Sequence, residues 1–125
     1  MASILIVEDD ADSSEALMRY LQQAGFKVEC KSNGRDALLS ILRDVPDLVI
    51  LDLFMPEMDG PSLLEIMRSY LRLGTLPVVI LTGITDSPLL DRARSLRVNT
   101  ILAKGRASLA DVLRAVQEQL PRLPP

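Results

Sequence analysis

Five short apolar runs, separated by stretches with helical periodicity, constrain the fold of this chain most. Residues 3–7, 48–51 and 76–81 carry almost no polar side chain, so we expect strands that are buried on both faces. Residues 26–31 alternate apolar and polar side chains, as a half-exposed edge strand does, and residues 98–103 are expected to form the last strand. Strands joined by helical crossovers form a parallel sheet that is covered on both faces.

The intervening stretches predict five helices. Asp12 or Ser13 is expected to cap the first, which Gly25 ends, and the others are expected over residues 35–43, 61–73, 86–96 and 108–120. Several apolar residues are expected on their inward faces, among them Ala16, Leu17, Leu21 and Ala24 in the first helix and Leu109, Val112, Leu113 and Val116 in the last.

Size and composition exclude several classes of protein. A chain of 125 residues predicts one domain, over residues 1–120, followed by a proline-rich tail or linker stub at 121–125. The sequence has no histidine, which excludes Ser-His and Cys-His catalysis, and its one cysteine, Cys30, allows no internal disulfide. A net charge of −3 gives no general attraction to nucleic acid or anionic membranes. Without a long apolar segment or a signal peptide, we expect a cytoplasmic protein.

Polar residues follow the predicted strands where each one ends. Asp52 comes directly after the run at 48–51, and Glu8 and Asp9 follow the first strand; Thr82 and Lys104 end the fourth and fifth. Ligands of parallel sheets bind at the carboxyl ends of the strands, so these groups are expected at one edge. The sequence therefore predicts phosphate chemistry at this edge, with Asp52 as the acceptor.

These residues, in this order and spacing, resemble the receiver domains of two-component response regulators. The likeness covers about residues 3–119 and includes the loop after Asp52, with Met55-Pro56 and Asp59-Gly60. It implies an α/β fold of the flavodoxin-like type: a five-stranded parallel sheet in the order 2-1-3-4-5, flanked by five helices. That strand order comes from the resemblance and not from the periodicity of the sequence.

Three carboxylates in one small site repel one another unless a divalent cation neutralises them, and oxygen ligands beside a phosphate favour Mg²⁺. The resemblance implies that Asp9 and Asp52 bind this metal directly, that Glu8 acts mostly through water and that the backbone carbonyl of Phe54 supplies another oxygen. Asp52 would then be phosphorylated, with Lys104 as a fixed positive charge and the Thr82 hydroxyl as a hydrogen-bond donor to the phosphoryl group.

The resemblance also implies the partners. Because the chain has no histidine, the donor phosphohistidine must belong to a sensor histidine kinase or a histidine phosphotransfer protein. We expect an output partner of unknown identity, no direct contact with nucleic acid or membrane, and a monomer or a phosphorylation-linked dimer. The protein is not expected to be an enzyme, apart from catalysing its own phosphorylation and slow dephosphorylation.

We compared three other functions with the sequence: a degenerate receiver, a phosphatase and a dinucleotide-binding enzyme. The main alternative is a degenerate receiver that binds proteins without being phosphorylated. A phosphatase of the haloacid dehalogenase type needs a second acid two residues after the nucleophile, where this chain has Phe54, and the absence of a glycine-rich loop after the first strand excludes a Rossmann enzyme.

The sequence departs from the family pattern at three places. Gly105 replaces the usual proline after the lysine, and Ile101 replaces the aromatic switch residue, so an aromatic switch linked to Thr82 is in doubt. The residues two positions after Asp52 and after Thr82 are Phe54 and Ile84, which cannot orient a hydrolytic water. We therefore expect slow self-dephosphorylation.

Overall fold

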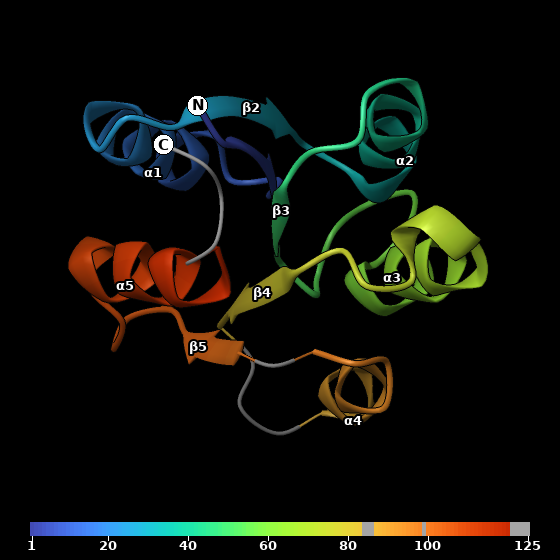
Figure 1. Cartoon of the computed structure of the whole chain (residues 1–125). Coiled ribbons are helices and arrows are strands. Elements are labelled where there is room, and N and C mark those ends of the chain that lie inside the picture. The colour runs from blue at the N-terminus through green and yellow to red at the C-terminus, as the bar shows by residue number, and fades with distance from the viewer. Residues whose placement is uncertain (84–86, 99, 121–125) are drawn as a thin grey trace.

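The apolar runs form one parallel sheet between two layers of helices (Figure 1). The computed structural model describes residues 1–83, 87–98 and 100–120. Its strands are β1 (Ser3–Val7), β2 (Lys27–Lys31), β3 (Leu48–Leu51), β4 (Val78–Thr82) and β5 (Thr100–Ala103). They lie in the order β2-β1-β3-β4-β5, and each neighbouring pair is parallel. The predicted fold class and strand order are confirmed.

Helices cover both faces of this sheet. They are α1 (Ala11–Gln23), α2 (Gly34–Arg43), α3 (Gly60–Ser69), α4 (Pro88–Arg94) and α5 (Leu109–Gln119), with a short 3₁₀ helix, η1 (Leu71–Leu73), after α3. α1 and α5 pack on one face, while α2, α3 and α4 pack on the other (Figure 1). Because the inner strands are buried on both sides, two separate aliphatic cores form, one on each face.

The first helix is capped differently from our prediction, which was wrong. Asp10 is the cap: its Oδ1 accepts hydrogen bonds from the backbone N–H groups of Asp12 at 3.0 Å and Ser13 at 3.3 Å. The backbone of Asp10 is still extended, so its carboxylate lies below the free N–H groups of the first turn. Asp12 and Ser13 are already inside the helix and supply donors instead.

The third helix is shorter than predicted. It ends at Ser69, Tyr70 is extended, and the chain then forms η1. Arg68 explains the break, because its guanidinium donates to the carbonyls of Leu73 and Leu76, each at 2.9 Å. The same side chain donates to Leu96 and Arg97, in the connection between α4 and β5. These hydrogen bonds hold the segment after Ser69 in a path that departs from a continuous helix.

Three expected inward positions are exposed. Ala16 and Ala24 of the first helical stretch are exposed, and Leu109 at the start of α5 keeps 40% of its surface accessible. The other predicted inward residues there, Leu17 and Leu21, are buried, as are Val112 and Val116 of α5. Ala16 and Leu109 lie where α1 and α5 do not close over each other, beside the pocket described below, whereas Ala24 is the C-cap of α1.

Some predicted boundaries fall outside the described residues. These are the start of the fourth helix at residue 86, part of the last strand at residue 99, and the proline-rich stretch 121–125. Among the residues that the structure describes, every helix is too short or too polar to serve as a membrane span.

Candidate functional site

Asp52 lies at the carboxyl end of β3, where the sequence placed it. Its backbone N–H donates to the carbonyl of Val7 at 3.0 Å, so the pairing with β1 continues to this residue. Only 7% of Asp52 is exposed. The loop that follows returns tightly to the strand, because Gly60 N–H donates to the carbonyl of Leu53 at 3.0 Å. A strand that is buried on both faces thus ends in a carboxylate at the edge of the sheet, as predicted.

Glu8 lies beside Asp52 because β1 and β3 are neighbours. Val7 pairs with Leu51, which brings the next residue of each strand to the same height. Glu8 is 6% exposed, and its Oε2 accepts a hydrogen bond from the backbone N–H of Asp10 at 3.2 Å. Two nearly buried carboxylates therefore face the same space, and charges in such a position need a partner.

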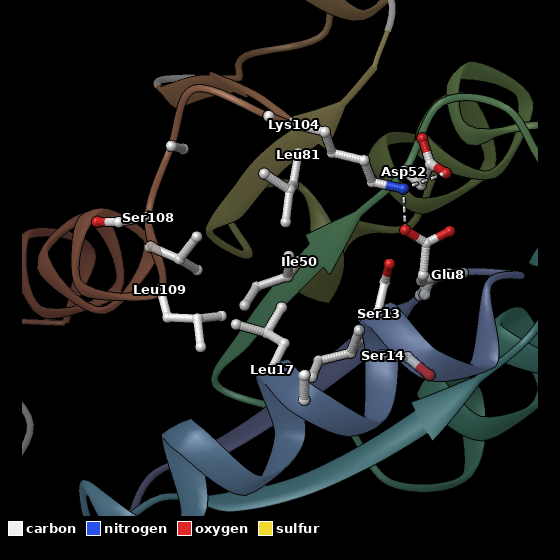
Figure 2. Close-up of a pocket in the computed structure, with 16 residues that line it drawn as sticks. Glu8, Ser13, Ser14, Leu17, Ile50, Asp52, Leu81, Lys104, Ser108 and Leu109 are labelled. Atoms are coloured by element: carbon white, nitrogen blue, oxygen red, sulfur yellow. Dashed lines mark hydrogen bonds and ion pairs between the residues drawn. The ribbon is translucent and has the colours of Figure 1, made fainter.

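Lys104 supplies that partner. Its Nζ forms an ion pair with Glu8 and lies 3.1 Å from Asp52 Oδ2, so one ammonium group bridges both acids (Figure 2). Burial lowers the pKa of Lys104, but its hydrogen bonds to Glu8 and Asp52 and their negative charges outweigh this, so the pKa is raised overall. Lys104 therefore remains positively charged next to the predicted acceptor.

Thr82 is the last residue of β4 and is 1% exposed. β4 lies between β3 and β5, and the backbone N–H of Lys104 donates to the Thr82 carbonyl at 2.9 Å. This bond fixes the start of the Lys104 loop against the end of β4. Thr82 is therefore at the same edge of the sheet as Asp52, one strand away.

Asp9 completes an acidic group that could hold a metal. One carboxylate oxygen from each of Glu8, Asp9 and Asp52 lies within 4.8 Å of the others. Asp9 is exposed, yet local desolvation raises its pKa, and the hydrogen bond and charge of Glu8 add to this effect. Oxygens that share one Mg²⁺ at about 2.1 Å are at most about 4.2 Å apart, so a small contraction would let this set bind one ion.

The loop after Asp52 contains the other predicted contact. The backbone N–H of Phe54 points to Asp52 Oδ1 at 3.4 Å, which places Phe54 next to the predicted acceptor, and Phe54 is 58% exposed. Asp59 instead caps α3 through a hydrogen bond from Ser62 N–H at 2.8 Å, which agrees with the turn and cap role that its position before Gly60 indicates. Asp59 also lies 4.0 Å from Arg92 of α4.

The structure thus brings the predicted residues Glu8, Asp9, Asp52 and Lys104 into direct proximity, with Thr82 and Phe54 adjoining them. Two features were missed from the sequence. We did not predict that Lys104 pairs with Glu8 as well as with Asp52. The signal was available, because two acids that follow neighbouring strands are expected to share one cation. Ser13 of α1, which lies beside the site, was singled out from the sequence only as a helix cap.

The chain is similar to a well-defined protein family. The model of the response regulator receiver domain matches residues 4–117. The transcriptional regulatory protein GltR of Pseudomonas aeruginosa is 40% identical over 84 residues, which are 67% of this chain and 35% of GltR. The chain therefore spans about a third of the length of this curated relative.

Solved structures show the same likeness over the whole domain. The signal receiver domain of a signal transduction histidine kinase from Syntrophus aciditrophicus has a TM-score of 0.89 at 31% identity, and the match covers 99% of this chain and 96% of that one. Chemotaxis protein CheY4 of Vibrio cholerae has a TM-score of 0.87 at 27% identity, with 96% and 99% covered.

Proposed function

This chain belongs to the response regulator receiver domain family, and we propose that it accepts a phosphoryl group on Asp52 from a phosphohistidine of a partner protein. One observation carries the proposal. Asp52 stands at the edge of the sheet, next to Glu8 and Asp9, and the Lys104 ammonium lies 3.1 Å from its carboxylate. A nucleophile, an acidic cluster and a fixed cation are the parts that such a transfer requires.

In the proposed reaction an oxygen of Asp52 attacks the phosphorus atom in line with the leaving group. A P–O bond to Asp52 forms while the P–N bond of the donor histidine breaks, and the histidine nitrogen takes the released electron pair. Lys104 is held in place by Glu8, so its charge is available to the phosphoryl oxygens without a large movement. Thr82, at the neighbouring strand end, is the proposed hydrogen-bond donor to the phosphoryl group.

The acidic cluster is proposed to hold Mg²⁺ through Asp9 and Asp52, with Glu8 mostly through water and the Phe54 carbonyl as a further ligand. When bound, the ion would neutralise charge on the transferring phosphoryl group. Glu8 then has a second task, because its bond to Lys104 keeps that ammonium next to the acceptor.

The partners and the place of action follow from this chemistry. We expect the donor to be a sensor histidine kinase or a histidine phosphotransfer protein, and the exchange to occur in the cytoplasm. GltR is a transcriptional regulatory protein, and most of its length lies outside the match. Any output through transcription would therefore require a further domain or a partner, and we propose no direct contact of this domain with nucleic acid. Beyond its own phosphorylation and slow dephosphorylation, we propose no catalytic turnover.

Intact-protein mass spectrometry after incubation with acetyl phosphate and Mg²⁺ tests the proposal. The wild-type protein should gain the mass of one phosphoryl group, and both Asp52→Asn and wild type in EDTA should gain none. Asp59→Asn is the matched control, because Asp59 lies in the same loop but caps α3 and should not alter the product. A wild-type protein that stays unmodified, while it still binds its partners, would instead support a degenerate receiver.

A further inference from the structure

A recess of about 350 Å³ opens beside the phosphorylation site, between α1 and α5. Its apolar lining comes from the sheet and both helices: Ile6, Leu17, Ile50, Leu81, Leu109 and Val112. Figure 2 shows Leu17, Ile50, Leu81 and Leu109 directed toward one shared space, with the Glu8, Lys104 and Asp52 group at one end. The lining is thus branched and aliphatic, with the polar groups confined to one end.

Small residues keep this recess open. Ala16 of α1 is exposed on its rim, and Gly105 and Ala107 line it from the loop before α5. A Cβ atom built on Gly105 would meet no other atom within 4 Å. Ala16 and Leu109 are exposed, contrary to the prediction from helical periodicity, because both line this open recess. The two helices leave a gap that no side chain fills within residues 1–83, 87–98 and 100–120, which the structure describes.

The size and lining of the recess suit a small molecule. Sites for small ligands begin at about 300 Å³ and combine mainly apolar walls with a few polar groups that fix orientation. Here the floor lies below α1 and α5, on β1, β3 and β4, so an occupant must enter between the helices. Burying an apolar body against these walls would remove apolar surface from water, which is favourable.

The charges at the polar end select among ligands. The ammonium of Lys104 is already engaged by Glu8 and Asp52, and Glu8 also accepts the N–H of Asp10. In the protein without a metal ion or a phosphoryl group, an anionic ligand in the recess would have to compete with Glu8 and Asp52 for Lys104, and a cationic ligand would lie against Lys104. A neutral hydroxyl avoids both penalties, and Figure 2 shows the Ser13 hydroxyl directed toward the Glu8 end.

We propose that this recess between α1 and α5 binds a neutral, amphipathic small molecule, with an apolar ring body among the aliphatic side chains and a hydroxyl group toward Ser13 and the Glu8–Lys104 pair. The apolar part of this site is separate from the proposed phosphate position, whereas its polar end adjoins that position, because Glu8, Asp52 and Lys104 also line the recess. Its binding can be measured without a phosphodonor, so its failure would leave the proposed function untouched.

Methyl-resolved NMR titration with three matched probes tests the site. Naphthol, which is neutral at pH 7, should cause saturable shifts in the methyl groups of the six apolar lining residues. Naphthoate and naphthylmethylamine, which have the same rings but a negative or positive charge, should bind roughly tenfold more weakly or not at all. The proposal is overturned if naphthol causes no saturable shift or if a charged probe binds more tightly than naphthol. A side chain of a docking protein would then be the better candidate for the occupant of the recess.

Variants locate the binding. Ala107→Phe should fill the recess and weaken naphthol binding by roughly tenfold or more, whereas Ala110→Phe adds the same ring at an exposed position of α5 outside the recess and should change nothing. If Ala107→Phe does not fold, Ala16→Leu serves the same purpose from the exposed rim of α1. Equal affinities in wild type and a folded filling variant would overturn the proposal.

Discussion

Lys104 holds together two carboxylates that would otherwise be buried without a counter-charge. Glu8 and Asp52 are each less than a tenth exposed, and both contact its ammonium group. Bringing two such acids into one site costs free energy unless a cation is present. The geometry that suits phosphoryl transfer is therefore also a local source of stability, and the same side chain serves both purposes.

Lys104→Met should destabilise the protein in EDTA, because Glu8 and Asp52 then repel each other. We expect a loss of about 1–3 kcal/mol in the free energy of unfolding, since the ammonium is partly open to solvent. Urea titrations would measure it. Mg²⁺ should recover part of the loss, and Lys104→Arg, which keeps the charge, should lose less. Equal stability of wild type and Lys104→Met in EDTA would contradict this account.

Phe54→Asn should shorten the lifetime of the phosphorylated protein. Phe54 stands two residues after the proposed acceptor Asp52 and has no group that could orient a water, whereas an amide there could do so. Because an amide can orient the water but cannot take its proton, an acceleration on the order of tenfold is expected, below that of a general acid–base group. Phosphate release after removal of the phosphodonor measures it. Leu39→Asn, at another exposed apolar position, is the control, and an unchanged lifetime in Phe54→Asn would refute the idea.

The acidic residues show which parts of the candidate site could be predicted from the sequence and which could not. Glu8, Asp9 and Asp52 were found from the sequence because each follows a buried strand, and strand ends gather at one edge of a parallel sheet. The cap of α1 was misassigned within the same acidic stretch. Asp10 and Asp12 have the same chemistry, and only the backbone conformation decides which carboxylate reaches the free N–H groups.

The β3–α3 loop depends on a close approach that only glycine permits. A Cβ on Gly60 would lie 2.6 Å from the Asp52 carbonyl oxygen and 2.8 Å from the Leu53 Cα, both backbone atoms that cannot move aside easily. Asp59 caps α3 at the same point, so the entry of the helix and the position of the acceptor are linked.

Gly60→Ala should therefore destabilise the protein by about 1–3 kcal/mol, as overpacking does, and slow phosphorylation of Asp52 by displacing its loop. Thermal unfolding and the acetyl phosphate reaction would measure the two effects. Gly83→Ala is the matched control, since a Cβ there meets nothing within 4 Å. Similar losses in both variants would show that the contact with Asp52 is not the cause.

Arg68 links three segments of the chain through hydrogen bonds to four carbonyls: those of Leu73, Leu76, Leu96 and Arg97. Arg68→Met should cost about 2–4 kcal/mol of unfolding free energy, because several of these acceptors are partly buried. Urea unfolding would measure it. Arg72→Met removes a single exposed bond to Leu42 and should cost far less. If the two variants are equally stable, the clamp has no energetic role.

The same arginine shows why the end of α3 could not be predicted from the sequence, although two of the apolar runs were placed correctly. β1 and β3 have the predicted bounds, because an apolar run must be buried wherever it goes. The helix expected over residues 61–73 has no internal glycine or proline after its first turn, so nothing local indicates an end. Its break at Tyr70 depends on carbonyls that Arg68 binds from elsewhere in the fold, and local periodicity does not contain that information.

At the scale of the whole molecule, the sheet separates two cores that differ in how well they are closed. The core under α2, α3 and α4 is the larger, while the core under α1 and α5 opens into the recess beside the site. Cys30 packs at the edge of this second core, and its thiol lies 3.8 Å from the carbonyl of Ser14 in α1. Cys30 is therefore a natural probe of how firmly α1 is held.

Burial raises the pKa of the Cys30 thiol, so less of it is thiolate at a given pH than in an exposed cysteine. Iodoacetamide should therefore modify native Cys30 on the order of tenfold or more slowly than the urea-unfolded chain, and the rate should rise at higher pH than is usual for a thiol. Mass spectrometry would follow the reaction. In the double variant Cys30→Ser and Ser32→Cys the thiol moves to an exposed position and should react at an ordinary rate. If native Cys30 reacts equally fast, α1 opens readily and its contact with Cys30 does not protect the thiol.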